Sequence, residues 1–433
     1  MTKMNAVIGT ALLLGVAALL FVASDTHLPS WKKLVSNVFS ESITPDDVKL
    51  RYRDSHVRVV VAAGHDEDHW GARFGDLKEE VLTRGISKHL TRFLEEDPYF
   101  SVTAVRDGET GAYTPEFAQY FDTRRSEILE FMQTQREGMR ARLFNGEVVR
   151  NVTIAHNPAP REVAIRLYGI NHWANQRDID LLVHLHVNDY PTRASGLPGK
   201  HSGFSVYIPE SQYPNARASR AMAETLYAQL ARFVGPSTLP GERAGIIESQ
   251  ELIALGSNAS QESASLFIEY GYIYEPQFLN PVLREQMLQE LAFQTYVGIR
   301  RYFSEEDHIL DSGYATTLLP HTFSRDLERG EVGSVEVLAL QAALHEGGWY
   351  PPGERSLTAC PINGNFGPCV EQAVKDFQVT HEEELRELQG PQFPSGRVDS
   401  DTRRVLNEWF GGAKKKEERG FLEKTVHFFG NLF

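Results

Sequence analysis

Cysteine and surplus positive charge are both scarce in this 433-residue sequence. Cys360 and Cys369 are its only cysteines, and two cysteines alone make a poor metal site, because structural zinc sites use four protein ligands. Lys and Arg number 44 against 58 Asp and Glu, which gives a formal net charge of −14. Surfaces that bind nucleic acid are basic, so the charge argues against a nucleic-acid partner.

The composition is otherwise that of an ordinary globular protein. Hydrophobic residues make up 41% of the chain and charged residues 24%, which does not indicate disorder. A chain of this length exceeds one small core, so we expect two or three folded units.

Long hydrophobic runs are missing except for one, at residues 4–24, with Lys3 just before it. Its length lies within what spans a bilayer, about 17–25 residues, and its end, "VAS", resembles a signal cleavage site. We therefore predict a signal or membrane-anchor segment at 1–24, cleaved or retained, and export of the rest to the cell envelope, periplasmic or extracytoplasmic. In such an oxidising compartment, Cys360 and Cys369 should form a disulfide that contributes about 2–3 kcal/mol.

Beyond a tether expected at 25–55, apolar strand patterns alternate with amphipathic helix patterns up to residue 303. This alternation predicts an α/β fold, a mostly parallel twisted sheet flanked by helices. Residues 115–144 are expected to form one long charged helix. A polar linker at 304–332 then leads to a compact helical unit at 333–410.

Three expected strands end on residues that can bind a metal or act as a base: His65, His186 and Glu269. Glu79 begins the helix that follows the first of them. Two histidines and one carboxylate, with a fourth position left for water, are typical of a catalytic zinc site, and a further carboxylate would serve as general base. The alternative is that each histidine is a hydrogen-bonded structural residue.

Residues 57–303 resemble the zinc-dependent N-acetylmuramoyl-L-alanine amidases of the family 3 type. The similarity is carried in order by "VVVAAGH", "GARFGDLKEEVLTRGISKHL", "VTAVRDG", "INHWANQRDIDLLVHLHVND" and "LFIEYGYIYEPQFL". The resemblance implies hydrolysis of the amide bond between N-acetylmuramic acid and L-alanine of the peptidoglycan stem peptide. It places the catalytic domain at residues 56–303.

Carried over residue by residue, the resemblance implies that His65, Glu79 and His186 bind Zn²⁺ and that Glu269 is the general base. Asn188 matches an Asn that follows the second histidine, and would contact substrate or support a ligand. Glu80 stays open as an alternative to Glu79.

The sequence departs from the family pattern in several places. Gly-His-Gly-Gly becomes Gly-His-Asp-Glu at 64–67. His184 replaces a Ser and faces the same way as His186 on a strand, and we expect it to be a hydrogen-bonding neighbour of the site. Glu275 stands where the family has Asn. The stretch 112–170 is an extended insertion, either a lid over the cleft or a solvated face.

Residues 333–410 resemble the three-helix peptidoglycan-binding domain. The matching pieces are "LALQ", "NGNFG", "AVKDFQ" and "DSDT", and "THEEELRELQGPQFP" is an insertion. The expected disulfide would close the loop that holds "NGNFG". Peptidoglycan is thus the expected partner of both units.

The tail at 411–433 combines three lysines with an apolar stripe at helical spacing. It would form an amphipathic helix that lies on a membrane or packs against the protein itself. Two other functions stay open at this point: a non-catalytic wall-binding scaffold that retains the amidase fold, and a zinc peptidase that acts on stem peptides.

Overall fold

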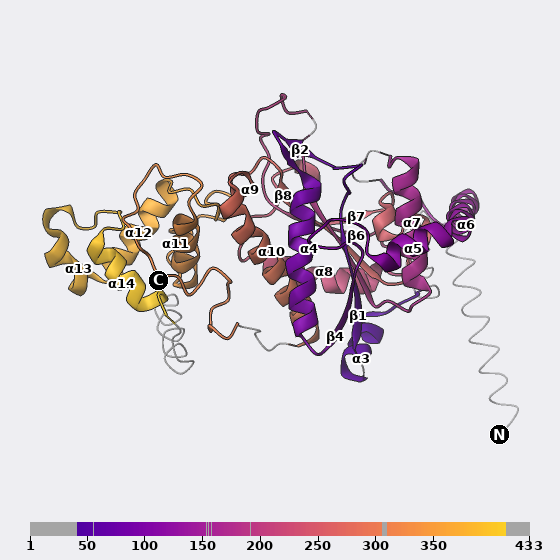
Figure 1. Ribbon diagram of the computed structural model, residues 1–433, viewed down its shortest axis with the longest axis horizontal. Coiled ribbons are helices and arrows are strands. Elements are labelled where there is room, and N and C mark those ends of the chain that lie inside the picture. Colours follow the sequence, from indigo (N-terminus) through magenta and orange to yellow (C-terminus); the bar gives the residue numbers. More distant parts are fainter. Residues whose placement is uncertain are drawn as a thin grey trace, which may run out of the picture.

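The computed structural model describes residues 41–412, except for residues 55, 153, 155, 157, 191 and 305–309. The apolar segment expected at 1–24 and nearly all of the tail expected at 411–433 lie outside the described residues. Figure 1 shows an elongated molecule with the sheet at its centre, helices α5 to α7 at one end and the C-terminal helices at the other. Among the described residues, no helix has the length and hydropathy to cross a bilayer.

Six strands form the main sheet in the order β4-β1-β5-β8-β6-β7. All neighbouring strands run parallel except β6 and β8, which are antiparallel. The predicted α/β fold with a mostly parallel sheet is thus confirmed. The strands are β1 (Val57–Ala63), β4 (Phe100–Ala104), β5 (Leu181–Asn188), β6 (Ser205–Pro209), β7 (Ile246–Ser249) and β8 (Ala264–Tyr272), while β2 (Arg73–Phe74) and β3 (Leu77–Lys78) form a small hairpin.

Helices cover both faces of this sheet because its central strands are apolar on both sides. Val59 and Val61 of β1 join one hydrophobic cluster, and Val60 and Ala62 join another. The first cluster includes side chains of α4 (Glu79–Glu96), α8 (Ala216–Leu230) and α10 (Pro281–Phe303), and the second includes side chains of α5 (Pro115–Thr123) and α7 (Arg161–Asn175).

The structure differs from the sequence analysis in three places. The single helix expected at 115–144 is two helices, α5 and α6 (Arg125–Phe144), which meet at Arg124, where φ is −108° and ψ is 14°. Within the tether expected at 25–55, residues 45–54 instead form α3 (Pro45–Asp54), whose Val48 is buried. Strand β7 was not expected from the sequence.

The C-terminal region is helical, with α11 (Val335–Glu346), α12 (Pro368–Thr380), α13 (Glu382–Gln389) and α14 (Ser400–Phe410). Helix α13 arises from the insertion "THEEELRELQGPQFP", so this region holds one helix more than the expected three. The predicted disulfide between Cys360 and Cys369 is confirmed. Short elements elsewhere are α9 (Pro276–Leu279), η1 (Pro240–Glu242), η2 (Ile253–Leu255), η3 (Ser257–Ala259) and η4 (Gly390–Gln392).

The helical region is docked on the sheet domain through a shared core. One hydrophobic cluster runs from Leu283 and Met287 of α10 to Leu340 and Ile362 of the helical region. Met287 of α10 and Ile362 of the helical region both line a cavity of about 20 Å³ at this contact. The described part of the expected linker is also packed, since its Tyr314, Leu318, Leu319, Phe323 and Leu327 are buried.

Candidate metal centre

The sheet brings the expected site residues together at the carboxyl ends of its central strands. His65 follows β1, His186 lies near the end of β5 and Glu269 lies in β8. Open parallel sheets bind their ligands at this edge. Glu79 is the first residue of α4, which begins directly after the β2–β3 hairpin.

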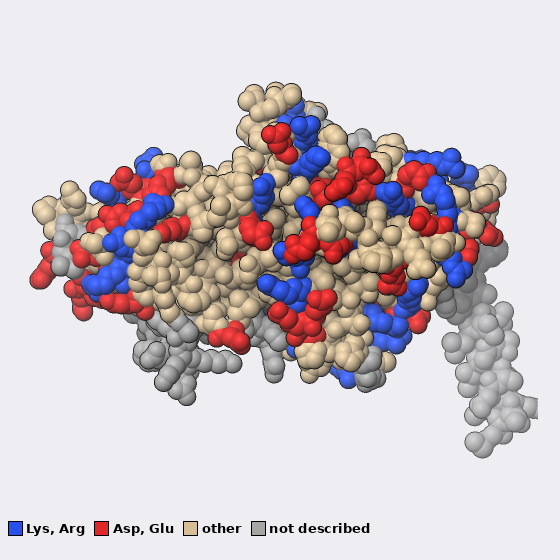
Figure 2. Space-filling model, in the orientation of Figure 1, with Lys and Arg blue, Asp and Glu red and all other residues tan. Residues whose placement is uncertain are grey.

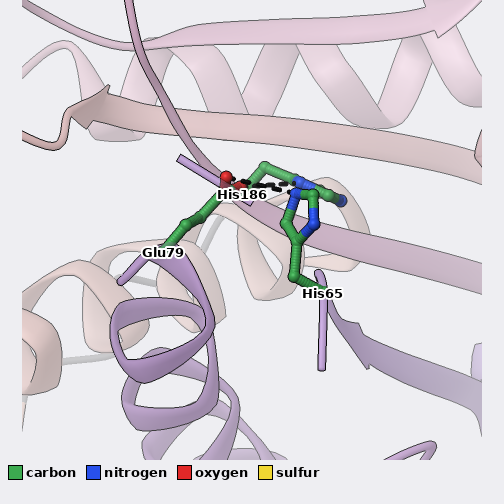
Figure 3. A group of neighbouring side chains, drawn as sticks. All are labelled: His65, Glu79 and His186. Atoms are coloured by element: carbon green, nitrogen blue, oxygen red, sulfur yellow. Dashed lines mark hydrogen bonds and ion pairs between the residues drawn. The ribbon is translucent and has the colours of Figure 1, made fainter. Parts of the chain in front are cut away.

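His65, Glu79 and His186 point toward one another (Figure 3). Nε2 of His65 lies 3.1 Å from Oε2 of Glu79, and Nδ1 of His186 lies 2.9 Å from Oε1 of the same carboxylate. One donor atom from each residue lies within 4.8 Å of the other two. Two imidazoles and one carboxylate are the donor set of catalytic zinc sites, so the residues present fit Zn²⁺.

The backbone holds the Glu79 carboxylate in place. The N–H of Ala72 donates to Oε2 at 2.8 Å and the N–H of Val187 to Oε1 at 3.1 Å. Burial raises the pKa of Glu79, but His65 and His186 outweigh burial and hold the pKa well below its usual range. Glu79 is therefore an anion at neutral pH, as a metal ligand must be.

Glu80 lies outside this cluster. Its Oε1 lies 3.4 Å from a guanidinium nitrogen of Arg106 and 3.4 Å from Nε of Arg84. Arg106 is 1% exposed, so Glu80 serves to balance a buried cation. The geometry therefore favours Glu79 over Glu80 as the carboxylate donor.

Glu269 lies beside the cluster, because its Cα pairs with that of His186 across β5 and β8. Burial, with added repulsion from Glu79 and Glu242, raises the pKa of Glu269 well above its usual value. Its Oε2 is buried and has no hydrogen-bond partner among the residues the structure describes. A carboxylate with a raised pKa is suited to accept and return a proton.

His184 is 2% exposed and lies outside the group of described residues that could share a metal ion. Burial, followed by repulsion from His186, lowers the pKa of His184 to about 3. The ring is thus neutral over the physiological range of pH. Its Nε2 is buried without a hydrogen-bond partner among the described residues, so the expected hydrogen-bonding role is not supported.

Asn188 contacts a carboxylate that the sequence gave no reason to select. Its Nδ2 donates to Oε1 of Glu242 at 3.0 Å, and Glu242 also accepts hydrogen bonds from Tyr207 at 2.7 Å and Tyr272 at 3.2 Å. Glu242 lies in the segment "PGERAG", which resembles a surface turn, yet only 1% of the residue is exposed. Glu275 is also structural, because it accepts from the N–H groups of Gly203 and Tyr272.

A cavity of about 1030 Å³ opens over the cluster. The metal-site residues line it together with Trp70, Asn188 and Glu269. The expected insertion supplies another part of the wall, through Arg136, Met139 and Leu143 of α6. The cavity is large enough for a substrate of several sugar or amino-acid units.

The fold and the cluster together define a metal-dependent hydrolase of the open α/β type. Residues 59–301, more than half of the chain, match the model of the Amidase_3 family, N-acetylmuramoyl-L-alanine amidase, and the chain belongs to this family. The protein is therefore a cell-wall amidase, and the His65, Glu79 and His186 cluster fits the zinc site of the family. A comparison with curated proteins gives no match.

Several solved structures are similar to this chain. The CwlD amidase of Clostridioides difficile, in complex with the GerS lipoprotein, is 15% identical and covers 58% of this chain and 100% of its own, with a TM-score of 0.39. AmiC2 of Nostoc punctiforme is 17% identical and covers 57% of this chain and 96% of its own, with a TM-score of 0.35. The catalytic domain of CwlV from Bacillus (Paenibacillus) polymyxa var. colistinus is 13% identical and covers 57% of this chain and 97% of its own, with a TM-score of 0.33. Values this low carry no argument about function, so the assignment rests on the family match.

Proposed function

We propose that this protein hydrolyses the amide bond between N-acetylmuramic acid and L-alanine of the peptidoglycan stem peptide, with Glu269 as general base. His65, Glu79 and His186 would hold Zn²⁺, and the observation that carries the proposal is their convergence beside Glu269 at one edge of the sheet. When bound, zinc lowers the pKa of a water molecule and polarises the scissile carbonyl.

Glu269 would take the proton of the attacking water and return it to the departing amine of L-alanine. Its burial and its free Oε2 support this role. Asn188 also lines the cavity. Its Nδ2 donates to Glu242, so its side-chain oxygen Oδ1 would be the atom that meets the substrate. His184 would be a neutral neighbour of the site, not a ligand.

Digestion of purified peptidoglycan tests the reaction. Mass spectrometry of the products should show free stem peptides that begin with L-alanine. Glu269→Gln should lower the rate by about 10²–10⁴-fold, while both proteins retain about one zinc ion per chain, as four-ligand catalytic sites bind a single ion. Products cut within the stem peptide would instead indicate a peptidase, and binding without cleavage would indicate a scaffold.

Residues 333–410 would form a peptidoglycan-binding domain. Supporting this, Gln341 of the "LALQ" motif accepts from the N–H groups of Asn363 and Gly364 at 3.0 Å and 2.8 Å. The motifs that carry the resemblance thus contact one another within one folded unit. The disulfide closes the adjacent loop.

Hydrogen exchange on the full-length Glu269→Gln protein tests this second binding site. With soluble peptidoglycan fragments, we expect protection both at the cleft and within residues 333–410. Protection confined to the cleft would show that the helical region does not bind the wall.

As a cell-wall amidase, the protein acts outside the cytoplasm. We extend the proposal to its delivery, with residues 1–24 as the export or anchor segment and the basic tail at 411–433 as a second membrane contact. The charge pattern of these two segments supports the extension. Fractionation of cells that produce the protein with and without residues 1–24 would test the role of this segment, and equal export of both forms would refute that role.

A further inference from the structure

His65 has an uncommon backbone conformation for a metal ligand. Its φ is 65°, in the left-handed region that costs a residue with a side chain about 1–2 kcal/mol. Such a residue persists only where its surroundings hold it. Arg106 provides part of this support, since its guanidinium donates a hydrogen bond to the His65 carbonyl.

The imidazole of His65 is held from its far side. Nδ1 lies 3.2 Å from the carbonyl oxygen of His69, to which it donates. This contact leaves Nε2 to face Glu79 and a metal ion. The hydrogen bond of the second ring nitrogen fixes the tautomer and the orientation of a metal-binding histidine.

Asp66 places that carbonyl. Its N–H donates to the His69 carbonyl at 3.1 Å, and its Oδ1 accepts the N–H of His69 at 2.8 Å and the N–H of Asp68 at 3.1 Å. Asp66 therefore closes the turn at 66–69 that carries the acceptor for His65. A glycine, which the family pattern has at this position, could not make the side-chain contacts.

The second oxygen of Asp66 is held by the insertion. Nη1 of Arg166 lies 2.5 Å from Oδ2, and the hydroxyl of Tyr113 donates to the same oxygen at 3.2 Å. The Arg166 guanidinium also lies over the Tyr113 ring, 5.1 Å from its centre. Tyr113 and Arg166 come from opposite ends of the segment 112–170.

We propose that Asp66, Tyr113 and Arg166 are positioning residues that hold His65 in its metal-binding orientation through the turn at 66–69. Two departures from the family pattern then contact each other: Asp66, which replaces a glycine, and the insertion 112–170. The insertion thereby supports the metal centre, apart from any part that α6 plays as a wall of the cavity. This inference rests on the proposed zinc site.

Metal affinity tests the inference without any substrate. Zinc dissociation constants are measured on the full chain by chelator competition, and the absorption spectrum of the Co²⁺-loaded protein reports the ligand geometry. Asp66→Gly and Arg166→Gln should each weaken zinc binding by about 10–100-fold and alter the cobalt spectrum. The double variant should bind zinc as tightly as Asp66→Gly alone, because both changes remove the same contact between Arg166 and Asp66.

Glu162→Gln is the matched control. Glu162 lies one turn before Arg166 on α7 and pairs with Arg125 at 2.8 Å, where both side chains are about half exposed. This variant should bind zinc as the wild type does. Asp66→Asn keeps an acceptor for the His69 N–H but loses the charge, so it should fold and lie between wild type and Asp66→Gly in affinity.

Three results would overturn the inference. The first is wild-type zinc affinity and cobalt spectrum in Asp66→Gly or Arg166→Gln. The second is an equal loss of affinity in Glu162→Gln, and the third is additive losses in the double variant. A wild-type protein that binds no zinc would refute the proposed function as well, so failure of the inference alone is distinguishable.

Discussion

At the scale of single residues, the metal centre leaves no room beside its carboxylate. A Cβ added at Gly71 would lie 2.3 Å from Oε2 of Glu79 and 2.5 Å from Cδ2 of His65. The φ of Gly71 is +76°, a conformation that favours glycine. Glycine is thus required here both for conformation and for space.

Gly71→Ala should weaken zinc binding by at least about 10-fold, because the new methyl group displaces a ligand that the backbone otherwise fixes. Gly75→Ala is the control: Gly75 also has a positive φ, +59°, but nothing lies within 4 Å of its added Cβ. It should lower stability slightly and leave zinc affinity unchanged. Chelator competition and thermal unfolding measure the two effects. Equal zinc affinity in both variants would contradict the prediction.

The sequence was sufficient to select His65, Glu79, His186 and Glu269 as candidates, because each lies at or near the end of a strand pattern or the start of a helix pattern, in a motif that resembles the family's. Strands β5 and β8 continue to Asn188 and Tyr272, past the ends expected at His186 and Glu269. It could not show the partners that support them. Asp66 and Arg166 are 100 positions apart, and Asn188 and Glu242 are 54 apart. Such contacts depend on how strands and helices pack, which no local pattern records.

At the scale of elements, two neighbouring glutamates in the first turn of α4 have different roles. Glu79 faces the histidines, while Glu80 faces Arg106, which follows β4 and in turn supports the backbone of His65. The helix start therefore supplies both a ligand and the balancing charge for a buried arginine.

Glu80→Gln should lower the free energy of unfolding by about 1–3 kcal/mol, because Arg106 loses a charged partner in the interior. It should retain zinc, whereas Glu79→Gln should lose most of its zinc. Denaturant unfolding and metal analysis of both variants check this. Loss of zinc in Glu80→Gln with normal stability would reverse the roles of the two residues.

Element types were largely predictable, because apolar strands and amphipathic helices alternate regularly. The break at Arg124 was not predictable, since the stretch "EFAQYFDTRRSEILEF" contains helix formers on both sides of Arg124 and has neither proline nor glycine. Packing of α5 and α6 against α7 decides the break. Strand β7 is short and pairs only with β6, so its sequence carries little signal.

At the scale of the whole molecule, the helical region and the sheet domain share one hydrophobic cluster. Figure 2 shows acidic and basic side chains interspersed over both. The contact is close at Gly235, where an added Cβ would lie 2.7 Å from the backbone nitrogen of Thr358. The two parts should therefore unfold together.

Calorimetry of the wild type should show one cooperative transition. Gly235→Ala should destabilise the protein by about 1–3 kcal/mol, because the methyl group forces the two parts apart. Gly367→Ala, where nothing lies within 4 Å of the added Cβ, should leave the transition nearly unchanged. Two separate transitions in the wild type would contradict a shared core.

Shared packing also has a consequence for how the wall would be cut under the proposal that residues 333–410 bind peptidoglycan. A glycan strand bound by this rigidly attached region would reach the catalytic cleft at a constant offset along the polymer. Successive cuts would then leave peptide-free stretches of regular length along the glycan. A flexible attachment would instead give stretches of variable length. The spacing of peptide-free sugars along digested strands would thus record the distance between the two parts of the protein.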